Sequence, residues 1–143
     1  DNDVMKSPVT VAIVDDDAFV RSALVSYVSA TPGFHLVHQC TNGAEAVDVI
    51  VADPVDVAIT DVRMPKLDGT EVLKRIKEDH ELRKMPVIMI TTTDDPREVE
   101  RCHELGCSSY ITKPVEYDAF VNAVRQLGLY LAVVQVPQVN GVH

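Results

Sequence analysis

The sequence predicts an α/β fold, a five-stranded parallel sheet with helices on both of its faces. Short runs rich in β-branched residues alternate along the chain with amphipathic stretches, which is the pattern of βαβ units. The short runs are apolar almost throughout, as expected for strands that are covered on both sides. The predicted strands are Val9–Val14, His35–Gln39, Asp56–Thr60, Pro86–Thr91 and Ser109–Thr112.

Helix signals follow each predicted strand. Apolar residues recur at helical spacing, and the first such set is Val20, Leu24, Tyr27 and Val28. Two helix starts match a capping box, in which a polar residue is followed three positions later by Glu: Asn42 with Glu45, and Asp95 with Glu98. Gly106 is placed to end the fourth helix. The fifth helix carries an apolar face from Tyr117 to Leu127, and its spacing can continue to Val134.

The length of 143 residues is that of one domain. Such a chain can bury roughly 68 to 70% of its unfolded surface, so it needs no disulfide or metal in order to fold. We expect a disordered segment over residues 1–8 and one folded domain over residues 9–127. Residues 128–143 are expected to form an extension of the fifth helix and a tail.

Composition and charge exclude several functions. The 22 acidic residues outnumber the 13 basic ones, and the net charge of −9 disfavours binding to nucleic acid. The three cysteines lack paired spacing, which indicates reduced thiols in a reducing compartment. The polar opening of the chain is unlike a signal peptide, and its longest apolar run, Leu129–Val134, is too short to span a bilayer. We therefore expect a cytoplasmic protein with no membrane contact.

Polar side chains stand where the predicted strands end. Asp15 and Asp16 follow the first strand, Asp61 follows the third, Thr91 ends the fourth and Lys113 follows the fifth. In an open parallel sheet, ligands bind at this carboxyl edge. The strand order 2-1-3-4-5, the common one for five parallel strands, places the first and third strands side by side. The three aspartates are therefore expected to meet.

Three carboxylates in one crevice repel one another unless a cation lies between them. Ligands that are all oxygen, with room for water, favour Mg²⁺. Beside such an ion, the carboxylate of Asp61 is a candidate nucleophile toward phosphorus. Lys113 and the hydroxyl of Thr91 can neutralise charge on the transferred group.

Each of these residues also has an ordinary structural interpretation. The run Asp15-Asp16-Asp17 before a helix is usually a cap, and Asp61 alone could be a turn residue. Thr91 fits a strand end, and a single Lys113 is more often a solvated charge. Their joint placement on four of five strand ends favours a site. Lys113-Pro114 is, in addition, a setting in which a cis peptide bond can occur.

Four motifs follow one another along the chain: Val11–Asp17, Asp61–Gly69, Pro86–Thr91 and Tyr110–Pro114. In this order they resemble the motifs of bacterial response-regulator receiver domains of the stand-alone, chemotaxis-regulator-like type. The resemblance runs from about Val9 to Leu127 and implies a flavodoxin-like (βα)5 fold. It also implies a signalling phosphoacceptor that catalyses only its own phosphorylation and dephosphorylation, with a histidine kinase or histidine phosphotransfer protein as donor and a downstream protein as target.

The resemblance implies a role for each site residue. Asp61 is the expected phosphoacceptor. Mg²⁺ is expected on Asp16, on Asp61, on the backbone carbonyl of Arg63 and, through water, on Asp15. Lys113 and Thr91 are expected to contact the phosphoryl group.

The resemblance further implies a switch. Thr91 is expected to move toward the phosphoryl group while Tyr110 turns inward, which changes the face formed by the fourth helix, fifth strand and fifth helix. The apolar stretch after Leu127 suggests homodimerisation through the fourth and fifth helices and this extension.

Other functions remain open at this point. The chain could be the receiver fragment of a transcription factor, or a degenerate receiver that binds partners without phosphorylation. An enzymatic alternative is a phosphohydrolase of the haloacid dehalogenase type, whose first motif Asp15-Asp16-Asp17 superficially fits. Against it, Phe19 stands where that motif has Thr or Val, no late acidic pair follows Lys113, and the chain is too short for a cap domain.

Overall fold

The computed structural model describes residues 8–92 and 95–127. The strands are β1 (Val9–Val14), β2 (Phe34–Cys40), β3 (Val57–Asp61), β4 (Val87–Thr91) and β5 (Ser109–Thr112). The helices are α1 (Ala18–Ala30), α2 (Gly43–Ala52), α3 (Gly69–Glu78), α4 (Pro96–Glu104) and α5 (Tyr117–Gln126). The predicted bounds of β1 and β5 are the observed ones. Those of β2 and β3 differ by one residue at both ends, and those of β4 differ by one residue at its start.

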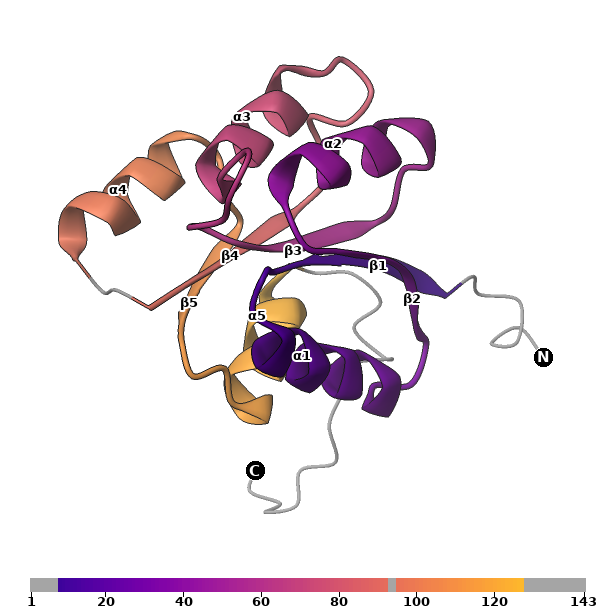
Figure 1. Cartoon of the computed structure of the whole chain (residues 1–143). Coiled ribbons are helices and arrows are strands. Elements are labelled where there is room, and N and C mark those ends of the chain that lie inside the picture. The colour runs from indigo at the N-terminus through magenta and orange to yellow at the C-terminus, as the bar shows by residue number, and fades with distance from the viewer. Residues whose placement is uncertain (1–7, 93–94, 128–143) are drawn as a thin grey trace.

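The strands form one parallel sheet of order β2-β1-β3-β4-β5, which confirms the predicted fold. Figure 1 shows α2, α3 and α4 over one face of the sheet, with α1 and α5 over the other. The register aligns the ends of the central strands, because Val14 pairs with Thr60 and Asp61 pairs with Ile90. The residues that follow these strands therefore share one edge.

Successive strand residues point into two separate cores, one on each side of the sheet. In β1, Ala12 and Val14 pack with the helices of one face, whereas Val11 and Ile13 pack with those of the other. Every residue of β3 and β4 is buried. These two strands are thus held on both sides, and their ends are well positioned to carry a site.

The caps agree with most of the sequence pattern. The Asn42 side chain accepts a hydrogen bond from Glu45 N at 2.9 Å, and that of Asp95 accepts one from Arg97 N at 2.9 Å. Glu98, assigned above to a capping box with Asp95, instead directs its carboxylate to residues outside the cap, as described below.

Gly106 ends α4 as predicted. Its N–H donates to His103 O and the N–H of Cys107 donates to Cys102 O, each at 3.0 Å, which is the hydrogen-bond pattern of a Schellman motif. Its φ of 102° lies in the region that favours glycine. Cys102 is the buried residue of this helix, so α4 is attached to the core more thinly than α3, which buries four residues.

The fifth helix is described as far as Gln126. Phe120, Val121 and Val124 are buried on its inner face, as the apolar pattern predicts. The predicted continuation to Val134 lies outside the described residues, as do residues 1–7. Within the described ranges, no helix is long and apolar enough to cross a membrane.

Replacing Gly106 by Ala should destabilise the protein. A Cβ at this position would lie 3.3 Å from Lys77 Cγ, and the positive φ is unfavourable for any residue with a side chain. We expect the free energy of unfolding to fall by about 1 to 2 kcal/mol in urea titrations. Gly106→Asn should lose less, because Asn tolerates this backbone region better. Equal stability of Gly106→Ala and the parent would contradict this account.

Candidate functional site

Three carboxylates meet at the carboxyl edge of the sheet, as predicted. One carboxylate oxygen from each of Asp15, Asp16 and Asp61 lies within 4.8 Å of the others. Asp15 follows β1 and Asp61 is the last residue of β3, and these two strands are hydrogen-bonded neighbours. Asp15 and Asp61 are buried, whereas Asp16 is exposed. The cluster therefore has a buried floor and an open side.

The three aspartates after β1 have two different roles: Asp17 caps a helix, and Asp15 and Asp16 belong to the carboxylate cluster. Asp17 caps α1, because its carboxylate accepts hydrogen bonds from the N–H groups of Phe19 and Val20. Asp15 Oδ1 accepts from Asp17 N at 2.8 Å, and the Arg21 guanidinium donates to Asp15 O at 2.7 Å. The cap interpretation is thus correct for Asp17, while Asp15 and Asp16 belong to the cluster.

Lys113 joins the two buried carboxylates. Its Nζ lies 3.3 Å from Asp15 Oδ2 and 3.2 Å from Asp61 Oδ2. Its backbone N–H donates to Thr91 O at 2.7 Å, and the Lys113-Pro114 peptide bond is cis. Burial lowers the pKa of Lys113, but the carboxylates of Asp15 and Asp61 outweigh this and raise the pKa above its ordinary value. The side chain therefore remains an ammonium ion.

Asp61 is unusually easy to protonate for an aspartate. Burial, followed by the nearby charge of Asp15, raises the pKa of Asp61 from 3.8 to about 6. The Lys113 ammonium and a hydrogen bond from the Arg63 backbone act in the opposite direction. The net shift shows that a single lysine does not fully compensate the buried negative charges.

Close packing of the next loop sets the position of Asp61. Gly69 begins α3, its N–H donates to Val62 O at 2.7 Å, and a Cβ at this residue would lie 2.0 Å from Asp61 O. A glycine is therefore required here. Asp68 caps the helix by accepting from Thr70 N and Glu71 N. The Asp68-Gly69 pair in the sequence thus anchors α3 against the end of β3.

The predicted switch residues meet on a carboxylate that the sequence analysis did not place in the site. Thr91 Oγ1 donates to Glu98 Oε2 at 2.6 Å, and the Tyr110 hydroxyl donates to the same oxygen at 3.1 Å. Arg63 Nη2 donates to Glu98 Oε1 at 2.8 Å. Burial and Glu98 raise the pKa of Tyr110 to about 12, so its hydroxyl stays protonated. Glu98 lies in the first turn of α4, the helix that follows β4, and this position is the sequence signal that could have indicated its place near the site.

The donor set fits a hard divalent cation. Asp15 Oδ2 is buried and has no hydrogen-bond donor among the described residues, although the Lys113 ammonium lies 3.3 Å away. A buried carboxylate oxygen of this kind is costly unless a cation compensates it. Three carboxylates with one exposed member leave room for water ligands, as Mg²⁺ prefers.

Comparisons with known proteins agree with this geometry. The chain matches the response regulator receiver domain over residues 11–125. It is 31% identical over 118 residues to the polar-differentiation response regulator DivK of Brucella anthropi, covering 82% of this chain and 94% of DivK.

Two solved structures are also similar. One is the CheX–CheY–BeF3–Mg complex from Borrelia burgdorferi, with a TM-score of 0.80, 28% identity and coverage of 90% of this chain and 95% of that one. The other is the signal receiver domain of NarL from Mycobacterium tuberculosis, with a TM-score of 0.78, 27% identity and coverage of 92% and 99%.

The chain therefore belongs to the response regulator receiver family. It is a phosphoacceptor domain of two-component signalling, related to DivK and CheY, and not an enzyme of the usual kind. This favours the signalling interpretation of the aspartate cluster over the phosphohydrolase alternative.

Without divalent cations, Asp61→Asn should stabilise the protein at neutral pH. The folded protein holds the Asp61 proton more tightly than the unfolded chain does, so stability is lost as the pH rises through about 6. Removing the charge should restore about 1 to 3 kcal/mol of unfolding free energy, measured in urea with a chelator present. The gain should vanish below pH 3.8, where the parent carboxyl is protonated in both states.

The matched control is Asp48→Asn, which removes the same charge from an exposed position on α2 and should change stability little. A less stable Asp61→Asn protein at neutral pH would contradict the raised pKa of Asp61.

Proposed function

We propose that Asp61 accepts a phosphoryl group from a phosphohistidine, with Mg²⁺ held at the aspartate cluster. The observation that carries this proposal is the meeting of three carboxylates within 4.8 Å, two of them in contact with Lys113. The proposed ligands are the carboxylates of Asp16 and Asp61, the Arg63 carbonyl and, through water, Asp15. When bound, Mg²⁺ would neutralise charge on the phosphoryl oxygens and on the carboxylates.

In the proposed transfer, an Asp61 carboxylate oxygen forms a bond to phosphorus. The phosphorus–nitrogen bond of the donor breaks, and its electron pair returns to the imidazole ring. Lys113 Nζ lies 3.2 Å from Asp61 Oδ2, where its ammonium can hold a phosphoryl oxygen. The Thr91 hydroxyl, at the end of the neighbouring strand, can donate to another. These residues supply positioning and charge, which is most of what phosphoryl transfer requires.

Phosphorylation would then change the face formed by α4, β5 and α5. Thr91 and Tyr110 are the proposed switch, with Tyr110 lying on β5 and contacting α4 through Glu98. A downstream protein would read this face. The related CheY structure is a complex with CheX, which supports output through protein contact. The net charge of −9 disfavours nucleic acid as the target.

The donor in this proposal is a histidine kinase or a histidine phosphotransfer protein. Cys40, Cys102 and Cys107 are free and buried, which suits the reducing conditions of the cytoplasm.

Incubation with acetyl phosphate and Mg²⁺ tests the phosphoacceptor. We expect mass spectrometry of the intact protein to show one added phosphoryl group and peptide mapping to place it on Asp61. Asp61→Asn and addition of a chelator should each abolish the modification, whereas Asp48→Asn should retain it. A phosphoryl group on another residue, or none on the parent, would refute the proposed function.

Homodimerisation through α4, α5 and the apolar extension is a further part of the proposal. Its apolar residues, Leu129–Val134, lie outside the described residues, so the support comes from the sequence. Light scattering of the full chain should give the mass of a dimer at high concentration, and replacing Leu129 and Leu131 by Ser should return it to the monomer. A monomer at every concentration would exclude this interface.

A further inference from the structure

Glu98 gathers three donors from three separate segments. Thr91 comes from the end of β4, Tyr110 from β5 and Arg63 from the loop after β3, while Glu98 itself lies on α4. The Glu98 side chain is 13% exposed, although that of Arg63 is 72% exposed. The carboxylate is therefore largely shielded from water and depends on these donors for its hydrogen bonds.

The contact with Thr91 is the important one of the three. A carboxylate can only accept hydrogen bonds, and a threonine hydroxyl has a single hydrogen to donate. In this structure the Thr91 hydroxyl donates to Glu98 Oε2 at 2.6 Å. It cannot at the same time donate to a phosphoryl oxygen on Asp61. Two anions, one on α4 and one at the end of β3, thus require the same donor.

We propose that Glu98 is a positioning residue that holds the Thr91 hydroxyl, together with Tyr110 and Arg63, in the unphosphorylated arrangement and competes with the phosphoryl group for it. This inference rests on the function proposed above. Breaking the Thr91–Glu98 hydrogen bond is then a required part of activation. Because Glu98 is on α4, releasing it removes the hydrogen bonds that join this helix to Thr91 on β4 and to Tyr110 on β5.

Glu98→Gln tests the competition. The amide keeps the size of the side chain but removes the charge, and hydrogen bonds to charged groups are roughly twice as strong as those to neutral ones. We expect beryllofluoride with Mg²⁺, a stand-in for the phosphoryl group, to bind about 3- to 10-fold more tightly to Glu98→Gln in calorimetric titrations. The rate of phosphorylation by acetyl phosphate should rise in parallel.

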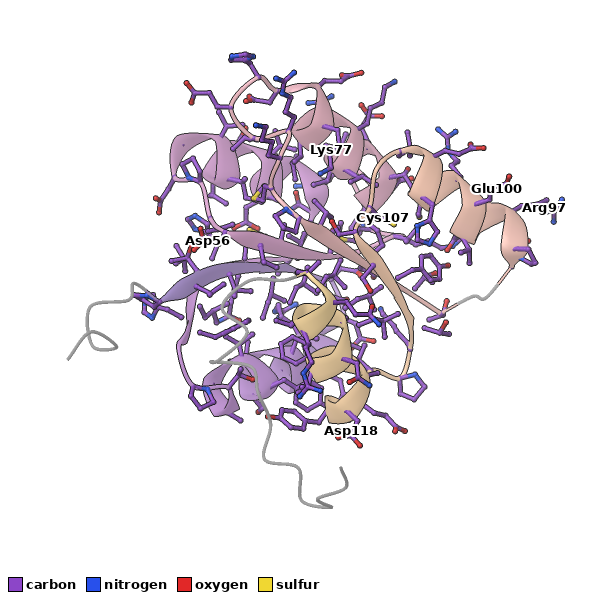
Figure 2. All side chains as sticks on the ribbon, turned by 180° about the vertical axis from the view of Figure 1, so that it is seen from behind. Asp56, Lys77, Arg97, Glu100, Cys107 and Asp118 are labelled. Carbon is purple, nitrogen blue, oxygen red and sulfur yellow. The ribbon has the colours of Figure 1, made fainter. Side chains whose placement is uncertain are left out.

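Glu100→Gln is the matched control. Glu100 lies on the same helix, labelled in Figure 2, and is exposed, so the charge change is identical but the Thr91 contact is intact. Its affinity for beryllofluoride should equal that of the parent. In a Thr91→Ala background, Glu98→Gln should have no further effect, because the contested hydroxyl is absent.

A measurement on the parent protein avoids any loss of folding. With ¹³C-labelled glutamate, the carboxyl resonance of Glu98 should shift when beryllofluoride binds, while that of Glu100 should stay. The inference is overturned if Glu98→Gln binds no more tightly than the parent, if its effect persists without the Thr91 hydroxyl, or if the Glu98 resonance does not move. Failure of the parent to bind beryllofluoride or accept a phosphoryl group would instead overturn the proposed function, and this inference with it.

Discussion

The contact of one lysine with two buried aspartates is the interaction on which the site depends. Asp15 and Asp61 are placed together because they stand at the ends of β1 and β3, which pair with each other. Lys113 reaches both from the end of β5. One positive charge shared by two buried negative charges leaves an excess of negative charge, and exposed Asp16 increases it. The folded protein is therefore stabilised either by removing one of these negative charges or by binding a second cation.

The sheet makes this arrangement rigid, and the helices around it differ in how firmly they are held. β3 and β4 are buried on both faces, so Asp61 and Thr91 project from fixed strand ends. On the same side of the sheet, α3 buries four residues and is locked by the close approach of Gly69 to Asp61, whereas α4 buries Cys102. Of these two helices, α4 is therefore held by fewer buried residues than α3. This difference agrees with the proposal that phosphorylation changes the face to which α4 contributes.

Much of the fold and the site could be predicted from sequence because both follow from local patterns and one topological rule. The apolar runs gave the strands, and the parallel order brought the residues after β1 and β3 together, so Asp15, Asp16 and Asp61 were foreseen. Glu98 was not foreseen in its observed role. Its spacing from Asp95 matches a capping box, which is a local pattern, whereas its partners come from three other segments and depend on how α4 packs. The hydrogen bond from the Arg63 guanidinium to Glu98 was not predicted, for the same reason.

The thin attachment of α4 has an evolutionary consequence. A helix that contributes one buried residue to the core can change most of its outer sequence at little cost in folding energy. The acidic floor of the site and the buried strands tolerate few substitutions, because a change there leaves a charge or a cavity uncompensated. Descendants of one ancestral chain can thus diverge in the proteins that they recognise through α4 while they retain the same acidic site and buried strands.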